Sequence, residues 1–264
     1  MKIKIFIVTY NNDVVLNKNL EHIYSSDILD YNYEVNIINN YSSISPKRYK
    51  YPNLNILNNV CRPDFSRGFL ARNWNQALFN GFKSISKPDC DLLIAMQNDT
   101  FVLPDCFKNT LTVSKSFDFF TAGAGDQYMA WTPSGIKKLG IFDERFCSLA
   151  CHEGDYFVNA IMIDKERVSI NDYHHNRLFN PIKDLNSRII KPDAHLNSSV
   201  INKKWHPFCI RFFSKKWNIP DTNWSSELKK SIIHPQIERY FTYPDFECDI
   251  NKNTLKYQKY NVEI

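Results

Sequence analysis

The sequence predicts an α/β fold with a mostly parallel central sheet flanked by helices. Short apolar runs at 3–9, 34–38 and 91–96, the first of them rich in β-branched residues, have the composition of buried strands. Segments in which apolar residues recur at helical spacing separate these runs. Strands that alternate with helices form parallel sheets, and ligands of such sheets bind at the carboxyl ends of the strands.

Each predicted element has a local signal. The first run ends in Tyr-Asn-Asn-Asp, and Asn12 or Asp13 then caps a helix that reaches about residue 25. Thr132 followed by Pro133 is typical of a helix start, because proline fits the first turn of a helix. The other expected elements are a short strand at 54–58, a helix at 71–83, a glycine-rich turn at 122–125, a strand at 127–131, a helix at 153–163 and a strand at 167–170.

The composition indicates a folded protein. Hydrophobic residues make up 43% and aromatic residues 14% of the 264 residues, whereas disordered chains are poor in both. The seven cysteines are odd in number and scattered, which favours a reducing compartment over a disulfide framework. No stretch approaches the roughly 20 apolar residues of a membrane-spanning helix, and the apolar run near the start is too short for a signal peptide. We therefore expect a cytoplasmic protein that is soluble or lies peripherally at the inner face of a membrane.

Polar residues follow three of the predicted strands, where a parallel sheet would gather them at one edge. The first strand delivers Thr9, Tyr10 and Asn11, and the second delivers Asn39. The strand at 91–96 leads to Asn98 and Asp99. A divalent metal that also holds a diphosphate needs only one or two protein carboxylates, because phosphate and water oxygens complete its shell. Asp99 is accordingly a candidate metal ligand. Arg72, whose guanidinium suits a diphosphate, is a further candidate for donor binding.

Five segments along residues 3–160 together resemble one enzyme family. They are Thr9-Tyr10-Asn11, Asn39-Asn40-Tyr41-Ser42, the stretch from Gly68 to Asn73, Gln97-Asn98-Asp99, and the stretch from Ser134 to Phe146 with Glu153-Gly154-Asp155-Tyr156 after it. In order and approximate spacing they are similar to the motifs of inverting GT-A glycosyltransferases of the bacterial and viral family 2 type, which includes rhamnosyl- and galactosyltransferases. The resemblance implies a Rossmann-like GT-A sheet and a metal-dependent hexosyl- or deoxyhexosyltransferase, as in polysaccharide biosynthesis.

The resemblance also implies a mechanism and its residues. An inverting transfer is a single displacement, so one carboxylate must accept the proton of the acceptor hydroxyl. That base would be Asp155, with Glu153 orienting the acceptor, or the two roles are reversed. The family often adds a histidine to its Mn²⁺ or Mg²⁺ ligands, for which His195 and His175 are the candidates beside Asp99.

Two positions depart from the family pattern. Gln97 stands where a first carboxylate often lies, which removes one anionic metal ligand. Asn39 stands where an aspartate often recognises a uracil or thymine ring, although its carboxamide still accepts a hydrogen bond from a ring N–H. Asn39 thus leaves the base preference open, and the expected donor is a UDP- or dTDP-sugar, with the sugar left open.

Two alternatives are weighed against this function. A nucleotidyltransferase usually has a basic, glycine-rich phosphate loop after its first strand, but residues 9–16 contain no Gly, Arg or Lys. A non-catalytic carbohydrate-binding or nucleic-acid-binding module would use the basic, aromatic C-terminal part, but it leaves Asp99, Glu153 and Asp155 without a role.

The chain is expected to divide into a catalytic domain at 1–192 and a basic, aromatic, helical extension packed on it at 193–264. Between 183 and 217 there are eight Lys or Arg and two acidic residues, interleaved with aromatic residues, which suits an anionic partner. The expected partners are a nucleotide-sugar donor and a glycan, lipid-linked or protein-linked acceptor, with peripheral membrane contact through the basic segment and no nucleic acid.

Overall fold

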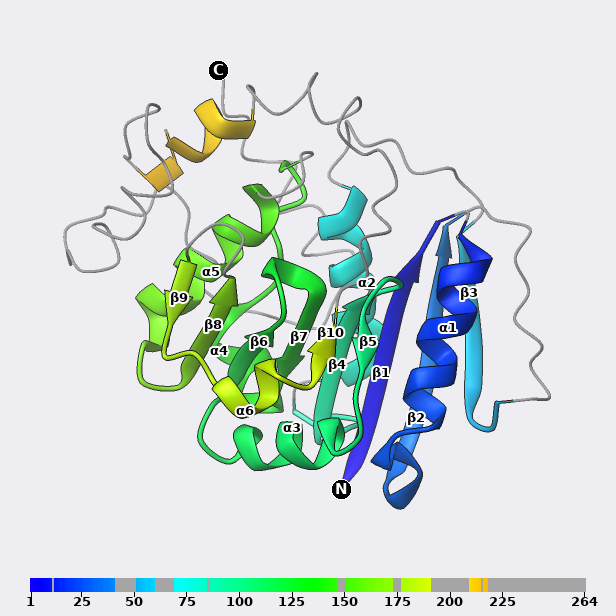
Figure 1. The fold of residues 1–264 in the computed structure, drawn as a ribbon. Coiled ribbons are helices and arrows are strands. Elements are labelled where there is room, and N and C mark those ends of the chain that lie inside the picture. The colour runs from blue at the N-terminus through cyan, green and yellow to red at the C-terminus, as the bar shows by residue number, and fades with distance from the viewer. Residues whose placement is uncertain are drawn as a thin grey trace.

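The computed structural model describes residues 1–10, 12–40, 51–59, 69–84, 86–146, 151–172, 177–190, 209–214 and 216–217. Within these residues an eight-stranded sheet has the order β3-β2-β1-β4-β7-β6-β8-β9 (Figure 1). Its strands are β1 (Lys2–Thr9), β2 (Asn32–Asn40), β3 (Leu54–Asn59), β4 (Leu92–Gln97), β6 (Phe119–Ala122), β7 (Tyr128–Trp131), β8 (Val168–Asp172) and β9 (Arg177–Phe179). β5 (Phe101–Val102) and β10 (Ile189–Ile190) pair separately.

The predicted parallel sheet is confirmed for the N-terminal half of the chain. β1 pairs in parallel with β2 and β4, and β2 pairs in parallel with β3. β7 is antiparallel to both β4 and β6, so the sheet is mixed beyond β4. β6 and β9, strands of four and three residues, are not among the elements expected from the sequence.

Helices cover both faces of the sheet. They are α1 (Asp13–Tyr24), α2 (Phe69–Phe82), α3 (Cys106–Ser114), α4 (Pro133–Leu139), α5 (Cys151–Asp164) and α6 (Lys183–Asn186). Alternate residues of β1 point to opposite faces: Ile5 and Ile7 pack with α1 and α3, whereas Phe6 and Val8 pack with α2, α4 and α5. Each face of the sheet is therefore covered by its own apolar layer.

The two predicted helix starts have the expected caps. The Asn12 side chain accepts a hydrogen bond from the backbone N–H of Val15 at the start of α1. Thr132 Oγ1 accepts from the backbone N–H of Gly135, and Pro133 occupies the first turn of α4. α5 begins two residues earlier than predicted, at Cys151, which places His152, Glu153 and Asp155 in its first turns.

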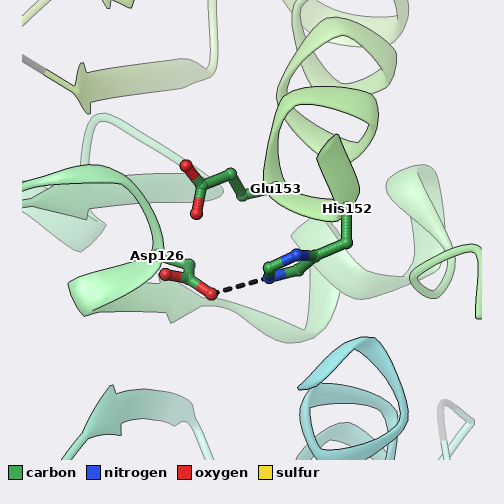
Figure 2. A group of neighbouring side chains, drawn as sticks. All are labelled: Asp126, His152 and Glu153. Carbon is green, nitrogen blue, oxygen red and sulfur yellow. Dashed lines mark hydrogen bonds and ion pairs between the residues drawn. The ribbon is translucent and has the colours of Figure 1, made fainter. Parts of the chain in front are cut away.

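The topology gathers several chain segments at one edge of the sheet. β1, β2 and β4 end together there, because Thr9 pairs with Asn39 and Val8 pairs with Gln97. The turn between β6 and β7 contains the short 3-10 helix η4 (Gly125–Gln127), and it lies at the same edge because Met96 pairs with Tyr128. His152 and Glu153, in the first turns of α5, lie beside Asp126 of the β6–β7 turn (Figure 2). No helix in the described part of the chain is long and apolar enough to cross a bilayer.

Candidate active site

The polar ends of β1 and β4 meet as the sequence predicted. Asn98 Nδ2 donates a hydrogen bond to Thr9 Oγ1 at 3.1 Å, and the Asn98 backbone N–H donates to the Val8 carbonyl. Tyr10 follows directly after Thr9, and Asp99 follows Asn98 with 9% of its surface exposed. A carboxylate, a hydroxyl and an amide thus lie on neighbouring strand ends.

Asn39 is buried and paired with the neighbouring strand. Its Nδ2 donates to Asn58 Oδ1 on β3 at 2.8 Å. Two other register positions of the same strands make the same kind of pair: Asn55 donates to Asn36, and Asn59 donates to Asn40. The Asn39 amide nitrogen therefore contributes to the pairing of β2 with β3, and its role in recognising a nucleobase stays a prediction.

A buried group that the sequence analysis missed in part lies where α5 meets the β6–β7 turn. Asp126, His152 and Glu153 each offer a ligand atom, and these atoms all lie within 4.8 Å of one another (Figure 2). His152 Nε2 lies 2.8 Å from Asp126 Oδ2. Gly125 lies against the Glu153 carboxylate, and a Cβ at this glycine would be 2.8 Å from Glu153 Oε1. Gly125 is therefore required both for this close approach and for its φ of 65°.

Asp126 is held by side chains from three elements. Trp74 Nε1 on α2 donates to Asp126 Oδ2 at 2.9 Å, and Gln97 Nε2 at the end of β4 donates to Asp126 Oδ1. Burial raises the pKa of Asp126, but hydrogen bonding to His152 and Trp74 and the charge of His152 outweigh it and lower the pKa to about 2. The Asp126 side chain is thus ionised, and it lies next to Glu153.

The contact between Gln97 and Asp126 explains the missing carboxylate at position 97. An acidic side chain there would face Asp126 at hydrogen-bond distance in a buried site. Like charges so placed repel each other strongly. Gln97 instead supplies the hydrogen-bond donor that the Asp126 carboxylate needs.

We expect Gln97→Glu to destabilise the protein more than Gln97→Met does at neutral pH. Both substitutions remove the donor to Asp126, which costs about 1–3 kcal/mol for a buried acceptor, but only the glutamate adds a like charge. Urea unfolding of both variants measures the difference. Equal midpoints for the two variants would show that residue 97 does not face an ionised Asp126.

Asp155 lies among contacts of a different kind. Its carboxylate accepts hydrogen bonds from Lys216 Nζ at 2.8 Å and from Trp217 Nε1 at 2.8 Å. Burial raises the pKa of Asp155, and the charge of Lys216 opposes that effect. Asp155 thus contacts the C-terminal residues Lys216 and Trp217, whereas Glu153 lies with Asp126 and His152 at the sheet edge.

The other predicted site residues lie apart from these groups or outside the described residues. The Arg72 side chain is 54% exposed, and its Nε lies 3.0 Å from Glu144 Oε2. Asn11, His175 and His195 lie outside the described residues, so their roles stay predictions. Asp126 and His152 have no family motif in the sequence, and their only local signals are a glycine-rich turn and the neighbouring Glu153.

Solved structures of known glycosyltransferases share this fold. No family model and no curated protein matches the chain, but solved structures do. A mannosyltransferase from Pyrobaculum calidifontis, solved with GDP-mannose and Mn²⁺, is similar over 87% of this chain and 69% of its own, with a TM-score of 0.58 and 12% identity. TarS from S. aureus is similar over 92% of this chain, with a TM-score of 0.53 and 11% identity, and the chain spans 44% of the length of TarS. The GT-A fold predicted from the sequence is therefore confirmed.

Proposed function

We propose that this protein is an inverting glycosyltransferase that moves a hexosyl or deoxyhexosyl group from a nucleotide-diphosphate sugar to an acceptor hydroxyl. The observation that carries the proposal is the position of Glu153. Its carboxylate is buried beside Asp126 and His152, at the edge where β1, β2 and β4 end and where ligands of parallel sheets bind. The glycosyltransferase fold of the structural neighbours supports this function over a nucleotidyltransferase or a carbohydrate-binding module.

Glu153 is the proposed base. Its carboxylate accepts the proton of the acceptor hydroxyl while the hydroxyl oxygen forms a bond to the anomeric carbon. The bond from that carbon to the diphosphate oxygen breaks, and the nucleoside diphosphate leaves with the electron pair. The negative charge of Asp126 next to Glu153 favours proton uptake, and the contact of Asp126 with His152 moderates this effect. Asp155 has the positioning role described below.

A divalent cation, Mn²⁺ or Mg²⁺, is the proposed cofactor. Oxygen ligands suit both ions, and Asp99 provides a carboxylate beside Asn98 and Thr9 at the strand ends. Asp126, His152 and Glu153 are close enough together to hold an ion, but Asp126 already accepts hydrogen bonds from Trp74, Gln97 and His152. We therefore assign the cation to Asp99 and the donor phosphates, with His195 or His175 as a further ligand. When bound, the cation neutralises charge on the departing diphosphate.

The donor-binding residues are proposed on position alone. Thr9, Tyr10, Asn39 and Asn98 lie at the ends of β1, β2 and β4, where the nucleotide of a GT-A donor would bind. Arg72 reaches the diphosphate only if it leaves Glu144. The acceptor, a glycan, lipid-linked or protein-linked hydroxyl, stays a proposal. Membrane contact through the basic segment is a separate proposal, and liposome binding at increasing salt tests it.

A thermal-shift panel tests the donor class. We expect one of UDP-, dTDP- or GDP-sugars to raise the melting temperature in the presence of Mn²⁺, because a ligand that binds only the folded state stabilises it by about 2.7 kcal/mol at roughly 100 times its Kd. Mn²⁺ alone and the matching nucleoside are the controls. If no nucleotide sugar adds to the shift produced by Mn²⁺ alone, the proposed donor class is wrong.

A further inference from the structure

The segment at 209–217 is bound tightly to the catalytic part of the chain. Its residues 209–214 and 216–217 are helical, and Cys209, Phe212, Phe213 and Trp217 are buried against Phe146, Cys151 and Val158. The Phe146 and Phe212 rings lie 4.7 Å apart. Two of the three partner residues belong to α5, the helix that carries Glu153.

A set of charged side chains and one indole lies within this apolar contact. We call it the clasp, and it consists of Asp143, Arg145, Asp155, Lys216 and Trp217. Lys216 Nζ lies 2.7 Å from Asp155 Oδ1 and 3.0 Å from Asp143 Oδ2. The side chains of Lys216, Asp155 and Asp143 are 4%, 4% and 0% exposed. Charges this deeply buried must be paired, because an unpaired one is strongly destabilising.

The two aspartates of the clasp depend on Lys216 to different extents. Asp143 also accepts hydrogen bonds from Arg145 Nε at 2.8 Å and from Arg145 Nη2 at 2.6 Å. Asp155, in contrast, has Lys216 as its cation and Trp217 Nε1 as a neutral donor. Loss of Lys216 therefore leaves Asp155 as a buried anion close to Asp143, whereas loss of the Asp155 charge leaves Lys216 paired with Asp143.

We propose that Lys216 and Trp217 are positioning residues for Glu153. By holding Asp155 they fix the first turn of α5, and Glu153 lies two residues before Asp155 in that turn. This inference rests on the proposed role of Glu153, and it makes the segment at 209–217 a part of the catalytic unit. It also gives Asp155 a structural role, whereas the sequence resemblance implied that Asp155 could be the base.

A set of substitutions in the full chain tests the proposal. Lys216→Gln is expected to lower kcat about 100-fold with little change in the Kd of the donor, because a small displacement of a catalytic group has an effect of that size. Asp155→Asn is expected to lower kcat by less than about tenfold, since a base would account for about 10²–10⁴-fold. The double variant is expected to recover at least about tenfold over Lys216→Gln, because no buried anion then lacks its cation.

Lys138→Met is the matched control. It removes a lysine that bridges Asp118 and Asp164 away from the sheet edge, so it lowers stability but is expected to leave kcat unchanged. If Asp155→Asn is the most damaging variant and the double variant shows no recovery, Asp155 is the base and the proposal is wrong. If Lys138→Met lowers kcat as much as Lys216→Gln does, the clasp affects kcat only through the overall stability of the fold, and the proposed positioning role is wrong.

Hydrogen exchange separates this inference from the proposed function. Amides at 151–158 are expected to exchange faster in Lys216→Gln and to regain protection in the double variant. If the wild-type protein transfers no sugar but exchange follows this pattern, the proposed function fails and the clasp stands. If exchange at 151–158 is the same in all variants, Lys216 does not position α5.

Discussion

Glu153→Gln is expected to lower kcat for sugar transfer by about 10²–10⁴-fold and to leave the Kd of the nucleotide sugar nearly unchanged. The amide keeps the size of the side chain, but it cannot accept the proton of the acceptor hydroxyl. The donor site at the strand ends does not depend on that proton. Single-turnover kinetics give the chemical step, and calorimetric titration with the donor gives its Kd.

Glu166→Gln is the matched control for this variant. Glu166 is exposed just beyond the other end of α5, so the same chemical change there tests whether any loss of carboxylate matters. We expect wild-type kinetics. Parallel losses of kcat and donor affinity in Glu153→Gln would indicate that Glu153 supports the structure of the site, and unchanged kcat would exclude it as the base.

The parallel half of the fold could be predicted because its signals are local. β1 alternates between two apolar faces, Asn12 caps α1, and Thr132-Pro133 opens α4. Each signal lies within a few residues and needs no knowledge of the partner. β6 and β9 were not predicted: each is only three or four residues long, although each pairs with a strand close in sequence, β7 and β8 respectively.

The candidate site was predicted only where motifs mark it. Thr9, Asn98 and Asp99 follow apolar strands, and the parallel topology brings those ends together. Asp126 depends on contacts with Trp74, Gln97 and His152, which lie 52, 29 and 26 positions away, so no local pattern could identify it.

The position of Lys216 in the C-terminal segment could not be predicted from the sequence either. Its lysines and aromatic residues predicted an exposed basic surface for an anionic partner, but Lys216 is buried on Asp155, 61 positions away. A lysine is expected at the protein surface, because burial of its charge requires a charged partner. The sequence does not show which residue that partner is. The predicted boundary at 192/193 lies outside the described residues, and it remains a prediction.

Asp99→Ala is expected to abolish transfer, and excess chelator is expected to do the same to the wild-type protein. Asp99 is the carboxylate that β4 delivers to the sheet edge, and Gln97 is committed to Asp126, so this strand supplies no second acidic ligand. Without Asp99 the cation would depend on the donor phosphates and a histidine. A departing diphosphate that is not neutralised raises the barrier by several kcal/mol.

Manganese binding, followed by calorimetry in the presence of the nucleoside diphosphate, distinguishes the two candidate cation sites. Asp99→Ala is expected to weaken binding strongly, whereas Asp126→Asn is expected to alter kcat and leave metal affinity close to that of the wild type. Asp105→Asn is the control, because Asp105 is an exposed acid just before α3 whose φ of 62° asparagine tolerates. If Asp126→Asn loses the metal and Asp99→Ala keeps it, the cation belongs with Asp126, His152 and Glu153. Glu153 would then be a ligand, and the proton of the acceptor would require another base.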